Sequence, residues 1–309
     1  SHPVKHLISI HDLAREEVDE ILTLATDLKE RQRRREPHAL LAGRTLAMIF
    51  EKPSTRTRVS FETGIFQLGG QPLVLTPGDT QLGRGETIHD TAKVLSRYVD
   101  GIMARTFAHQ TVLDLAEHGT VPVINGLTDL LHPCQILADL LTIQERFPRL
   151  DEVVIAYLGD GNNVAHSLLY GAAKVGATIR VATPAGHAPD AEVTVTAKAD
   201  AQASGATIEI LEDPAAAVDG AHVVYTDTWT SMGQDEEAKA RRATFRPYQV
   251  NAELMARARP DAIVMHCLPA HRGDELTDEV MDGPQSVVFD EAENRLHAQK
   301  AVMALLMQG

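Results

Sequence analysis

The sequence predicts an α/β protein built from two doubly wound parallel-sheet domains, and three observations support this fold class. The chain has 309 residues, about twice the usual length of one domain. Short apolar runs alternate with amphipathic stretches of helical length, as parallel strands with crossover helices require. A break near Pro148 separates two such series. We therefore expect a first domain over residues 1–148 and a second over 149–289.

The first series follows an amphipathic helix near the start of the chain. The apolar residues of this helix recur at spacings of three and four from Leu13 to Leu28, and Asp12 is its expected N-cap. The expected strands span residues 46–50, 72–75, 101–104 and 121–124, and the expected helices span 55–68, 86–98, 110–118 and 133–147. This order predicts the first parallel sheet.

The second series begins after Pro148. Its expected strands span residues 153–158, 179–182, 207–210, 221–225 and 262–266. A last amphipathic helix covers about residues 290–309, with its apolar positions between Ala298 and Leu306. We expect this helix to pack back on the first domain.

The composition excludes several classes of protein. The chain carries 29 Lys plus Arg against 43 Asp plus Glu, a formal net charge of −14, which opposes non-specific binding to nucleic acid or to an anionic membrane. The basic run 31–35 is interpreted as the solvated end of the first helix, where cations are favoured. The sequence contains no apolar run of membrane-spanning length and no signal-peptide pattern at residues 1–6. We expect a cytoplasmic enzyme whose two cysteines, Cys134 and Cys267, are free thiols.

Polar residues follow three strands of the first domain, where ligands bind in open parallel sheets. Residues 54–58, Ser-Thr-Arg-Thr-Arg, open a helix directly after a strand, with Ser54 as its expected N-cap. The residues expected on or near the apolar side of this helix are Val59, Phe61, Ile65, Phe66 and Leu68. Free amide groups, hydroxyls and guanidinium groups at a helix N-terminus are suited to bind phosphate. Arg105 ends another strand, and His132 and Gln135 lie at the start of a further helix. These groups predict a single anion pocket.

The second domain has comparable strand ends, at residues 159–163, at Asp227 and at 266–275. The segment Gly159-Asp160-Gly161-Asn162-Asn163 partly resembles a dinucleotide fingerprint, but Val164 replaces the third glycine and no acidic residue ends the next strand. The cysteines and histidines lack the usual zinc-ligand spacings. We therefore expect no cofactor and no metal, and a turn that presents Asn163.

Taken together, these motifs resemble, in order, those of the ornithine carbamoyltransferases, within the aspartate/ornithine carbamoyltransferase superfamily. The resemblance extends from the first helix to Arg295 in the last. The Ser-Thr-Arg-Thr and His-Pro-x-Gln segments are shared by transcarbamoylases in general. The segments Ser231-Met232-Gly233 and His266-Cys267-Leu268-Pro269 point to ornithine rather than aspartate.

The resemblance implies transfer of a carbamoyl group from carbamoyl phosphate to the δ-amine of L-ornithine, most simply in arginine biosynthesis. It implies an active site in the cleft between the domains, no cofactor, and a homotrimer in which Gln81 reaches a neighbouring phosphate site. The groups implied to act in catalysis are Arg56, Arg105, His132, Asp227 and Cys267. Those implied to bind carbamoyl phosphate are Ser54, Thr55, Arg56, Thr57, Gln81, Arg105, His132, Gln135, Cys267, Leu268 and Arg295. Those implied to bind ornithine are Asn163, Asp227, Ser231 and Met232.

Other functions remain open at this point. One is a transcarbamoylase for another amine, such as putrescine or an acetylated ornithine. A second is a binding protein that keeps the fold without turnover, and a third is a nicotinamide dehydrogenase. The loop 81–86 also differs from the corresponding loop of the aspartate enzymes, because it contains Arg84 and no lysine. Whether this loop supplies a positive charge to the active site of a neighbouring subunit is therefore open as well.

Overall fold

The computed structural model describes residues 5–79, 85–230 and 235–308. The chain divides into two compact units, one made of residues 1–141 and 294–309 and the other of residues 142–293. The expected boundary near Pro148 lies a few residues after this division. The last helix, α12 (Val288–Met307), begins in the second unit and continues in the first.

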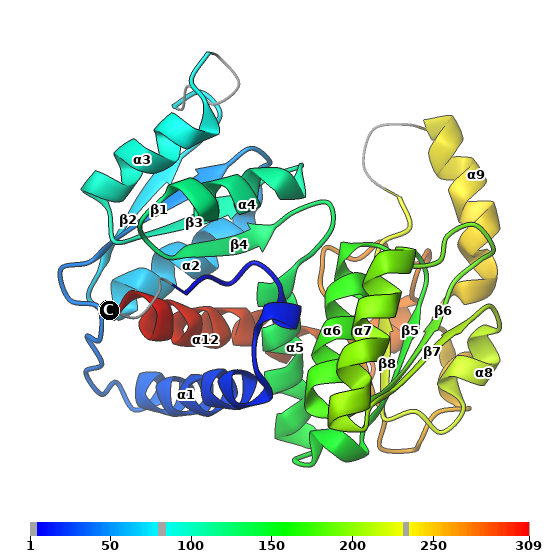
Figure 1. Cartoon of the computed structure of the whole chain (residues 1–309). Helices are drawn as coiled ribbons and strands as arrows, with labels where there is room; N and C mark the ends of the chain where they lie inside the picture. Colours follow the sequence, from blue (N-terminus) through cyan, green and yellow to red (C-terminus); the bar gives the residue numbers. More distant parts are fainter. Residues whose placement is uncertain (1–4, 80–84, 231–234, 309) are drawn as a thin grey trace. The chain divides into compact units, whose positions relative to one another are not determined.

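The first unit contains a parallel sheet in the order β2-β1-β3-β4, formed by Gln71–Leu75, Thr45–Phe50, Gly101–Arg105 and Val123–Leu127. The helices that connect these strands are α2 (Thr55–Gln67), α3 (Ile88–Tyr98) and α4 (His109–His118), and α5 (Pro133–Arg146) follows β4. Figure 1 shows α3 and α4 side by side near this sheet. The chain runs outward from β1 to β2 and then returns to β3 on the other side of β1, so the sheet is doubly wound.

The first helix departs from the prediction at its start. Asp12 lies in a short 3-10 helix, η1 (Ile10–Asp12), and α1 (Arg15–Arg33) begins three residues later. The carboxylate of Glu17 accepts a hydrogen bond from the Ala14 N–H at 3.0 Å. Asp12 as the N-cap was therefore wrong, because a side chain from inside the helix caps this end. The predicted apolar face, from Leu13 to Leu28, is buried.

Two further expectations for the first unit need correction. β4 begins two residues later than predicted and continues through Leu127, because its pairing with β3 runs from Val123 to Leu127. On α2, Val59 and Phe66 were placed on or near the apolar side, yet their exposed fractions are 53% and 73%. The buried residues of that helix are Thr57, Phe61, Gly64 and Ile65.

The second unit contains a parallel sheet in the order β7-β6-β5-β8-β9. Its strands are Thr207–Leu211, Thr178–Ala182, Val154–Leu158, Val223–Thr226 and Ile263–His266. The chain runs from β5 outward to β7 at one edge of the sheet, and then returns to β8 and β9 on the other side of β5. This sheet is therefore doubly wound as well, and the predicted fold class is confirmed.

The helices of the second unit lie on both sides of its sheet. Figure 1 shows α6 (Asn163–Val175) and α7 (Ala191–Ser204) together on one side and α8 (Pro214–Val218) on the other. The remaining elements are α9 (Asp235–Phe245), α10 (Ala252–Met255), α11 (Asp278–Met281), η2 (Leu150–Glu152) and η3 (Arg246–Tyr248). Every helix in the described ranges is too short or too polar to cross a bilayer.

Candidate active site

Each sheet has a switch point between two neighbouring strands, where the connection after one strand leads toward one edge of the sheet and the connection after the other leads toward the opposite edge. In the first unit it lies between β1 and β3, and in the second between β5 and β8. The loops beyond the carboxyl ends of strands at a switch point form the crevice in which open α/β sheets bind ligands. The polar residues singled out in the sequence follow these four strands and their neighbours β4 and β9.

The N-terminus of α2 lies beyond β1 in the first unit. Ser54 is its N-cap, as predicted, and the Ser54 hydroxyl accepts a hydrogen bond from the Thr57 N–H at 3.2 Å. Thr55 and Arg56 are exposed on the first turn, whereas the Thr57 side chain is buried. The free N–H groups and the positive end of the helix dipole therefore meet exposed polar side chains, which is an arrangement suited to an anion.

Two guanidinium groups converge on the Thr57 hydroxyl. Arg105, at the end of β3, donates from Nη1 to Thr57 Oγ1 at 3.3 Å, and Arg295 of α12 donates from Nη2 to the same oxygen at 3.3 Å. Arg295 also donates from Nη1 to Gln135 Oε1 on α5 at 3.0 Å. Four of the residues predicted to bind carbamoyl phosphate are therefore in direct contact within one unit.

His132 lies just before α5 and is 6% exposed. Burial holds the pKa of His132 well below its usual value, and the positive charges of Arg295, Arg105 and Lys52 lower it further. A neutral imidazole can donate one hydrogen bond to a carbonyl oxygen without adding a proton to the site. Cys134, two residues on, is also buried, and burial raises the pKa of its thiol to about 12. Cys134 is therefore a packing residue.

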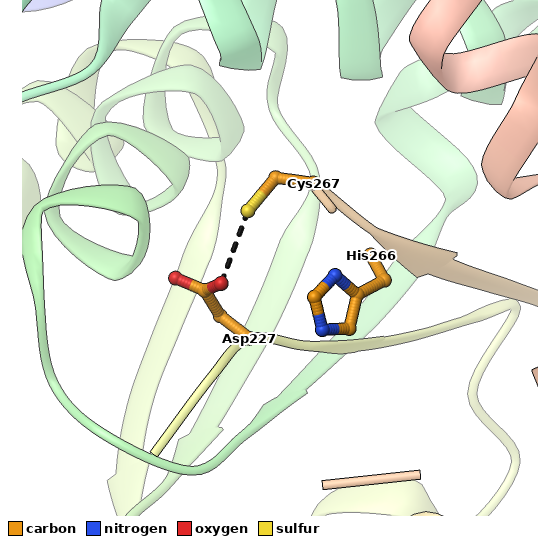
Figure 2. Close-up of side chains that lie close together, drawn as sticks. All are labelled: Asp227, His266 and Cys267. Atoms are coloured by element: carbon orange, nitrogen blue, oxygen red, sulfur yellow. Dashed lines mark hydrogen bonds between the residues drawn. The ribbon is translucent and has the colours of Figure 1, made fainter. Parts of the chain in front are cut away.

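The switch point of the second unit places Asn162, Asp227 and Cys267 together. Asn162 caps α6 and donates from Nδ2 to Asp227 Oδ2 at 2.8 Å. Cys267, after β9, donates from Sγ to Asp227 Oδ1 at 3.0 Å (Figure 2). Asp227 is 7% exposed, and its carboxylate also accepts the Thr228 N–H. These bonds orient a buried carboxylate that can attract an ammonium group.

Gly161 of the partial fingerprint belongs to the tight turn before α6. Gly161 donates its N–H to His187 O at 2.9 Å, and a Cβ at Gly161 would lie 2.3 Å from Pro189 N. In a dinucleotide site the second glycine lets the pyrophosphate approach the backbone. Here the backbone of residues 187–189 occupies that space, which argues against the dehydrogenase alternative.

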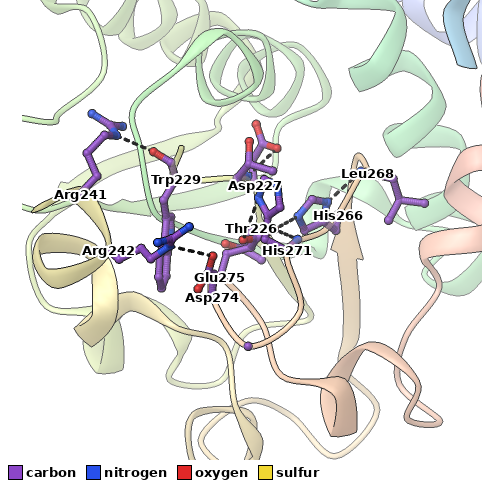
Figure 3. A network of polar contacts seen from close by, with 12 residues as sticks. Thr226, Asp227, Trp229, Arg241, Arg242, His266, Leu268, His271, Asp274 and Glu275 are labelled. Carbon is purple, nitrogen blue, oxygen red and sulfur yellow. Dashed lines mark hydrogen bonds and ion pairs between the residues drawn. The ribbon is translucent and has the colours of Figure 1, made fainter. Parts of the chain in front are cut away.

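The loop after β9 is held by a buried carboxylate. Glu275 Oε1 accepts from His266 Nε2 and from the His271 N–H, both at 2.8 Å (Figure 3). His266 Nδ1 in turn accepts the Leu268 N–H at 2.8 Å, at a residue whose φ is +61°. Because Nδ1 is an acceptor, Nε2 carries the proton, and neither nitrogen of His266 has a lone pair left for a metal.

This tautomer bears on a cluster that could hold a metal. Asp227, His266 and Cys267 bring ligand-type atoms within 4.8 Å of one another (Figure 2). With His266 fully engaged, the cluster offers only Asp227 and Cys267, which already bind each other. This donor set does not fit a tetrahedral zinc site.

Arg241 of α9 anchors the segment after β8. Its guanidinium donates to the Trp229 carbonyl oxygen (Figure 3) and to Asp160 Oδ2 at 2.9 Å, and lies over the Phe245 ring. The turn before α6 and the segment that leads to Ser231 and Met232 therefore share one anchor. Ser231, Met232 and Gln81, three of the predicted site residues, lie outside the described residues.

Sequence reasoning missed several residues of these networks. It proposed Asn163, yet Asn162 provides the bond to Asp227, while Asn163 Oδ1 accepts from Val164 N–H. An N-cap at the first residue before a helical pattern was the available signal. Glu275 and Arg241 carried no such signal, because their roles depend on partners from distant segments.

Comparison with known proteins identifies the family of the chain. Residues 5–145 match the carbamoyl-P binding domain of aspartate/ornithine carbamoyltransferases, and residues 151–306 match the Asp/Orn binding domain. The chain belongs to the ornithine carbamoyltransferases of this family. The prediction from the motifs is thereby confirmed.

Individual relatives cover almost the entire chain. An ornithine carbamoyltransferase of Thermococcus kodakarensis is 58% identical over 99% of this chain and 97% of its own length. One from Pyrococcus furiosus, described as anabolic, is 57% identical over 99% of this chain and 97% of its own length. A solved ornithine carbamoyltransferase structure from Pyrococcus furiosus has a TM-score of 0.97 at 56% identity and covers 99% of this chain and 98% of that one.

Proposed function

We propose that the protein transfers the carbamoyl group of carbamoyl phosphate to the δ-amine of L-ornithine, giving L-citrulline and phosphate. The observation that carries this proposal is the complementary charge of the two switch points. One presents guanidinium groups around a helix N-terminus, and the other presents a buried carboxylate, Asp227, beside a thiol. The first suits a phosphate and the second suits an amine.

We assign the phosphate to the amides and side chains of the first turn of α2, from Ser54 to Thr57. Arg105 bridges phosphate and carbonyl oxygen, while His132 and Gln135 hold the carbamoyl group and Arg295 adds positive charge. Attack on the carbamoyl carbon places negative charge on its oxygen, and the loss of one donor to such an oxygen typically costs about 3–4 kcal/mol. A neutral His132 suits this role, because its low pKa keeps a donor available without competing for protons.

Ornithine binds, on this proposal, to Asn163, Asp227, Ser231 and Met232, with Cys267 and Leu268 beside the reacting centre. The δ-amine is mostly protonated at neutral pH and must lose a proton before it attacks. Asp227 is held by hydrogen bonds from Asn162, Thr228 and Cys267, so its carboxylate is preoriented to steer the amine. The tetrahedral intermediate then expels phosphate.

Both substrates must come within bonding distance, so we propose that the two half-sites meet in a cleft between the domains during turnover. Holding two reactants face to face removes up to about 7–11 kcal/mol of the barrier in the most favourable intramolecular cases. We propose that residues 1–148, with the last helix, bind carbamoyl phosphate and that residues 149–289 bind ornithine. The matches over 5–145 and 151–306 support this order of the domains, and the bonds of Arg295 to Thr57 and Gln135 support grouping the last helix with the first domain.

The experiment is citrulline formation from carbamoyl phosphate with ornithine, putrescine, N-acetylornithine or aspartate as the acceptor. Preference for ornithine supports the proposal. Activity only with another amine refutes the second half-site, and inactivity with all four favours the binding-protein alternative.

We also propose that the enzyme serves arginine biosynthesis in the cytoplasm and works as a homotrimer. The anabolic description of the Pyrococcus furiosus relative supports the direction, and two free thiols agree with a reducing compartment. Exposed apolar residues on the first unit, among them Val59, Phe66 and Tyr98, support association through that unit. Rescue of an arginine-requiring strain tests the direction, and light scattering tests the trimer.

A further inference from the structure

Gln299 lies one helical turn after Arg295 on α12 and is fully buried. Its Oε1 accepts a hydrogen bond from Arg295 Nε at 2.8 Å, and its Nε2 donates to Ser60 Oγ on α2 at 2.8 Å. The amide therefore connects the guanidinium of Arg295 to the helix whose N-terminus we assign to phosphate.

The direction of these hydrogen bonds is determined by Ser60. The Ser60 hydroxyl uses its hydrogen to donate to the Arg56 carbonyl oxygen at 2.7 Å. Ser60 Oγ can therefore only accept in its bond with Gln299, so Gln299 Nε2 is the donor. Arg295 has only donors, so its partner must be an acceptor. An amide meets both requirements, because one end accepts and the other donates. A carboxylate would lack the donor, and an apolar side chain would lack both.

The guanidinium of Arg295 is planar and rigid, so a bond at Nε orients its two terminal nitrogens as well. Those nitrogens donate to Gln135 Oε1 and Thr57 Oγ1, at 3.0 and 3.3 Å. Arg295 itself is only 5% exposed. The bond from Arg295 Nε to Gln299 therefore restrains rotation of the Arg295 guanidinium group.

We propose that Gln299 is a positioning residue that orients Arg295 toward the phosphate of carbamoyl phosphate. This inference rests on the proposed function, in which Arg295 faces that substrate. Gln299 touches no substrate. Its effect is to keep the positive charge of Arg295 aimed at the first turn of α2, which raises affinity for the phosphate group.

The test is steady-state kinetics and phosphate binding by calorimetry for Gln299→Met, with inorganic phosphate as the binding probe. Methionine has a similar length and is apolar, so the bond to Arg295 is lost while volume is retained. We expect the KM for carbamoyl phosphate and the Kd for phosphate to rise about tenfold, because hydrogen bonds to charged groups are among the stronger ones. The KM for ornithine should not change.

Lys300→Met is the matched control. Lys300 is the next residue on α12 and is equally buried, and it also bonds α2, through Gln67 Oε1 at 2.8 Å. Its ammonium group contacts Gln67 and His38 rather than the Arg295 network. We expect it to leave the KM for carbamoyl phosphate unchanged. An equal rise in KM for Lys300→Met would show that the packing of α12 on α2 is responsible, and would overturn the inference.

A double-mutant cycle excludes a purely structural role. In an Arg295→Ala background, Gln299→Met should produce no further rise in KM, because the group that it orients is gone. Additive effects would refute the inference. If Gln299→Met does not fold, Ser60→Ala removes the acceptor for the Gln299 amide and should raise the same KM by a smaller factor, again only when Arg295 is present.

The two proposals fail in different ways. If the wild type makes citrulline and the variants match it in both KM and Kd, the positioning role is refuted and the proposed function stands. If the wild type makes no citrulline but Gln299→Met weakens phosphate binding, the proposed reaction is refuted and the positioning of Arg295 stands. A wild type that neither makes citrulline nor binds phosphate refutes both.

Discussion

The two cysteines should react with alkylating reagents at very different rates. Burial raises the pKa of the Cys134 thiol to about 12, so at pH 8 only about one molecule in 10,000 carries the reactive thiolate there. An ordinary thiol with a pKa near 8.5 is about one quarter ionised at that pH. The pKa alone therefore slows Cys134 by on the order of a thousandfold relative to an ordinary thiol.

Cys267 differs in its exposure. It is half-buried at the end of β9, with Sγ bonded to Asp227, whereas Cys134 is 1% exposed and donates to the Asn125 carbonyl oxygen at 3.5 Å. Reagent can reach the first thiol in the folded protein, and it can reach the second only when the structure opens. We expect labelling of Cys267 in minutes and of Cys134 only after denaturation.

The assay is iodoacetamide labelling at pH 8, with peptide mass spectrometry at successive times. The control is Cys267→Ser, which should remove all fast labelling. Comparable rates for the two cysteines in the native protein would refute the reasoning, because they would mean that Cys134 is neither buried nor suppressed in its ionisation.

Three further changes test the two half-sites. Arg105→Gln should lower kcat/KM by about 100-fold to 1,000-fold through loss of a donor to the developing oxyanion, with a near-normal melting temperature; activity like wild type would remove Arg105 from the mechanism. Burial lowers the pKa of His132, so the unfolded chain takes up a proton below pH 6.5 before the folded chain does. Wild-type unfolding free energy should therefore fall, relative to His132→Gln, by about 1.4 kcal/mol per pH unit from 6.5 down to the folded-state pKa; parallel urea-unfolding profiles would contradict this. Glu275→Ala leaves the buried His266 Nε2–H and the partly buried His271 N–H without their acceptor, so it should destabilise the protein by about 2–5 kcal/mol and raise the KM for ornithine, because the loop that Glu275 holds carries Cys267, the partner of Asp227. Calorimetry and initial rates measure both, and a change confined to the carbamoyl phosphate KM would be the contrary result.

Much of the local structure followed from the sequence. The strands and long helices of the first domain were predicted within about three residues, because apolar periodicity and capping are properties of neighbouring residues. The Ser54 N-cap is one example. The expectation failed at Asp12, where Glu17 caps the helix from inside, and at Val59 and Phe66, whose apolar character does not say which surface they occupy.

The family could also be read from the sequence through the resemblance of its motifs, and the apolar pattern located the strands that most of these motifs follow. Sequence pattern could not establish which motifs touch. Arg295 contacts Gln135, 160 positions away, and Thr57, 238 positions away. Asp227 is held by Asn162 and Cys267, which come from two other strand ends.

Only the tertiary structure decided these contacts, because hydrogen bonds between distant segments depend on strand order and on the burial of each side chain. The same burial lowers the pKa of His132 and raises that of Cys134, although the two residues lie in one motif. The sequence by itself therefore determined the elements, the family and the chemical types of the site residues. The fold determined their partners, their protonation and the positioning residue Gln299, which no local pattern distinguishes from an ordinary helical glutamine.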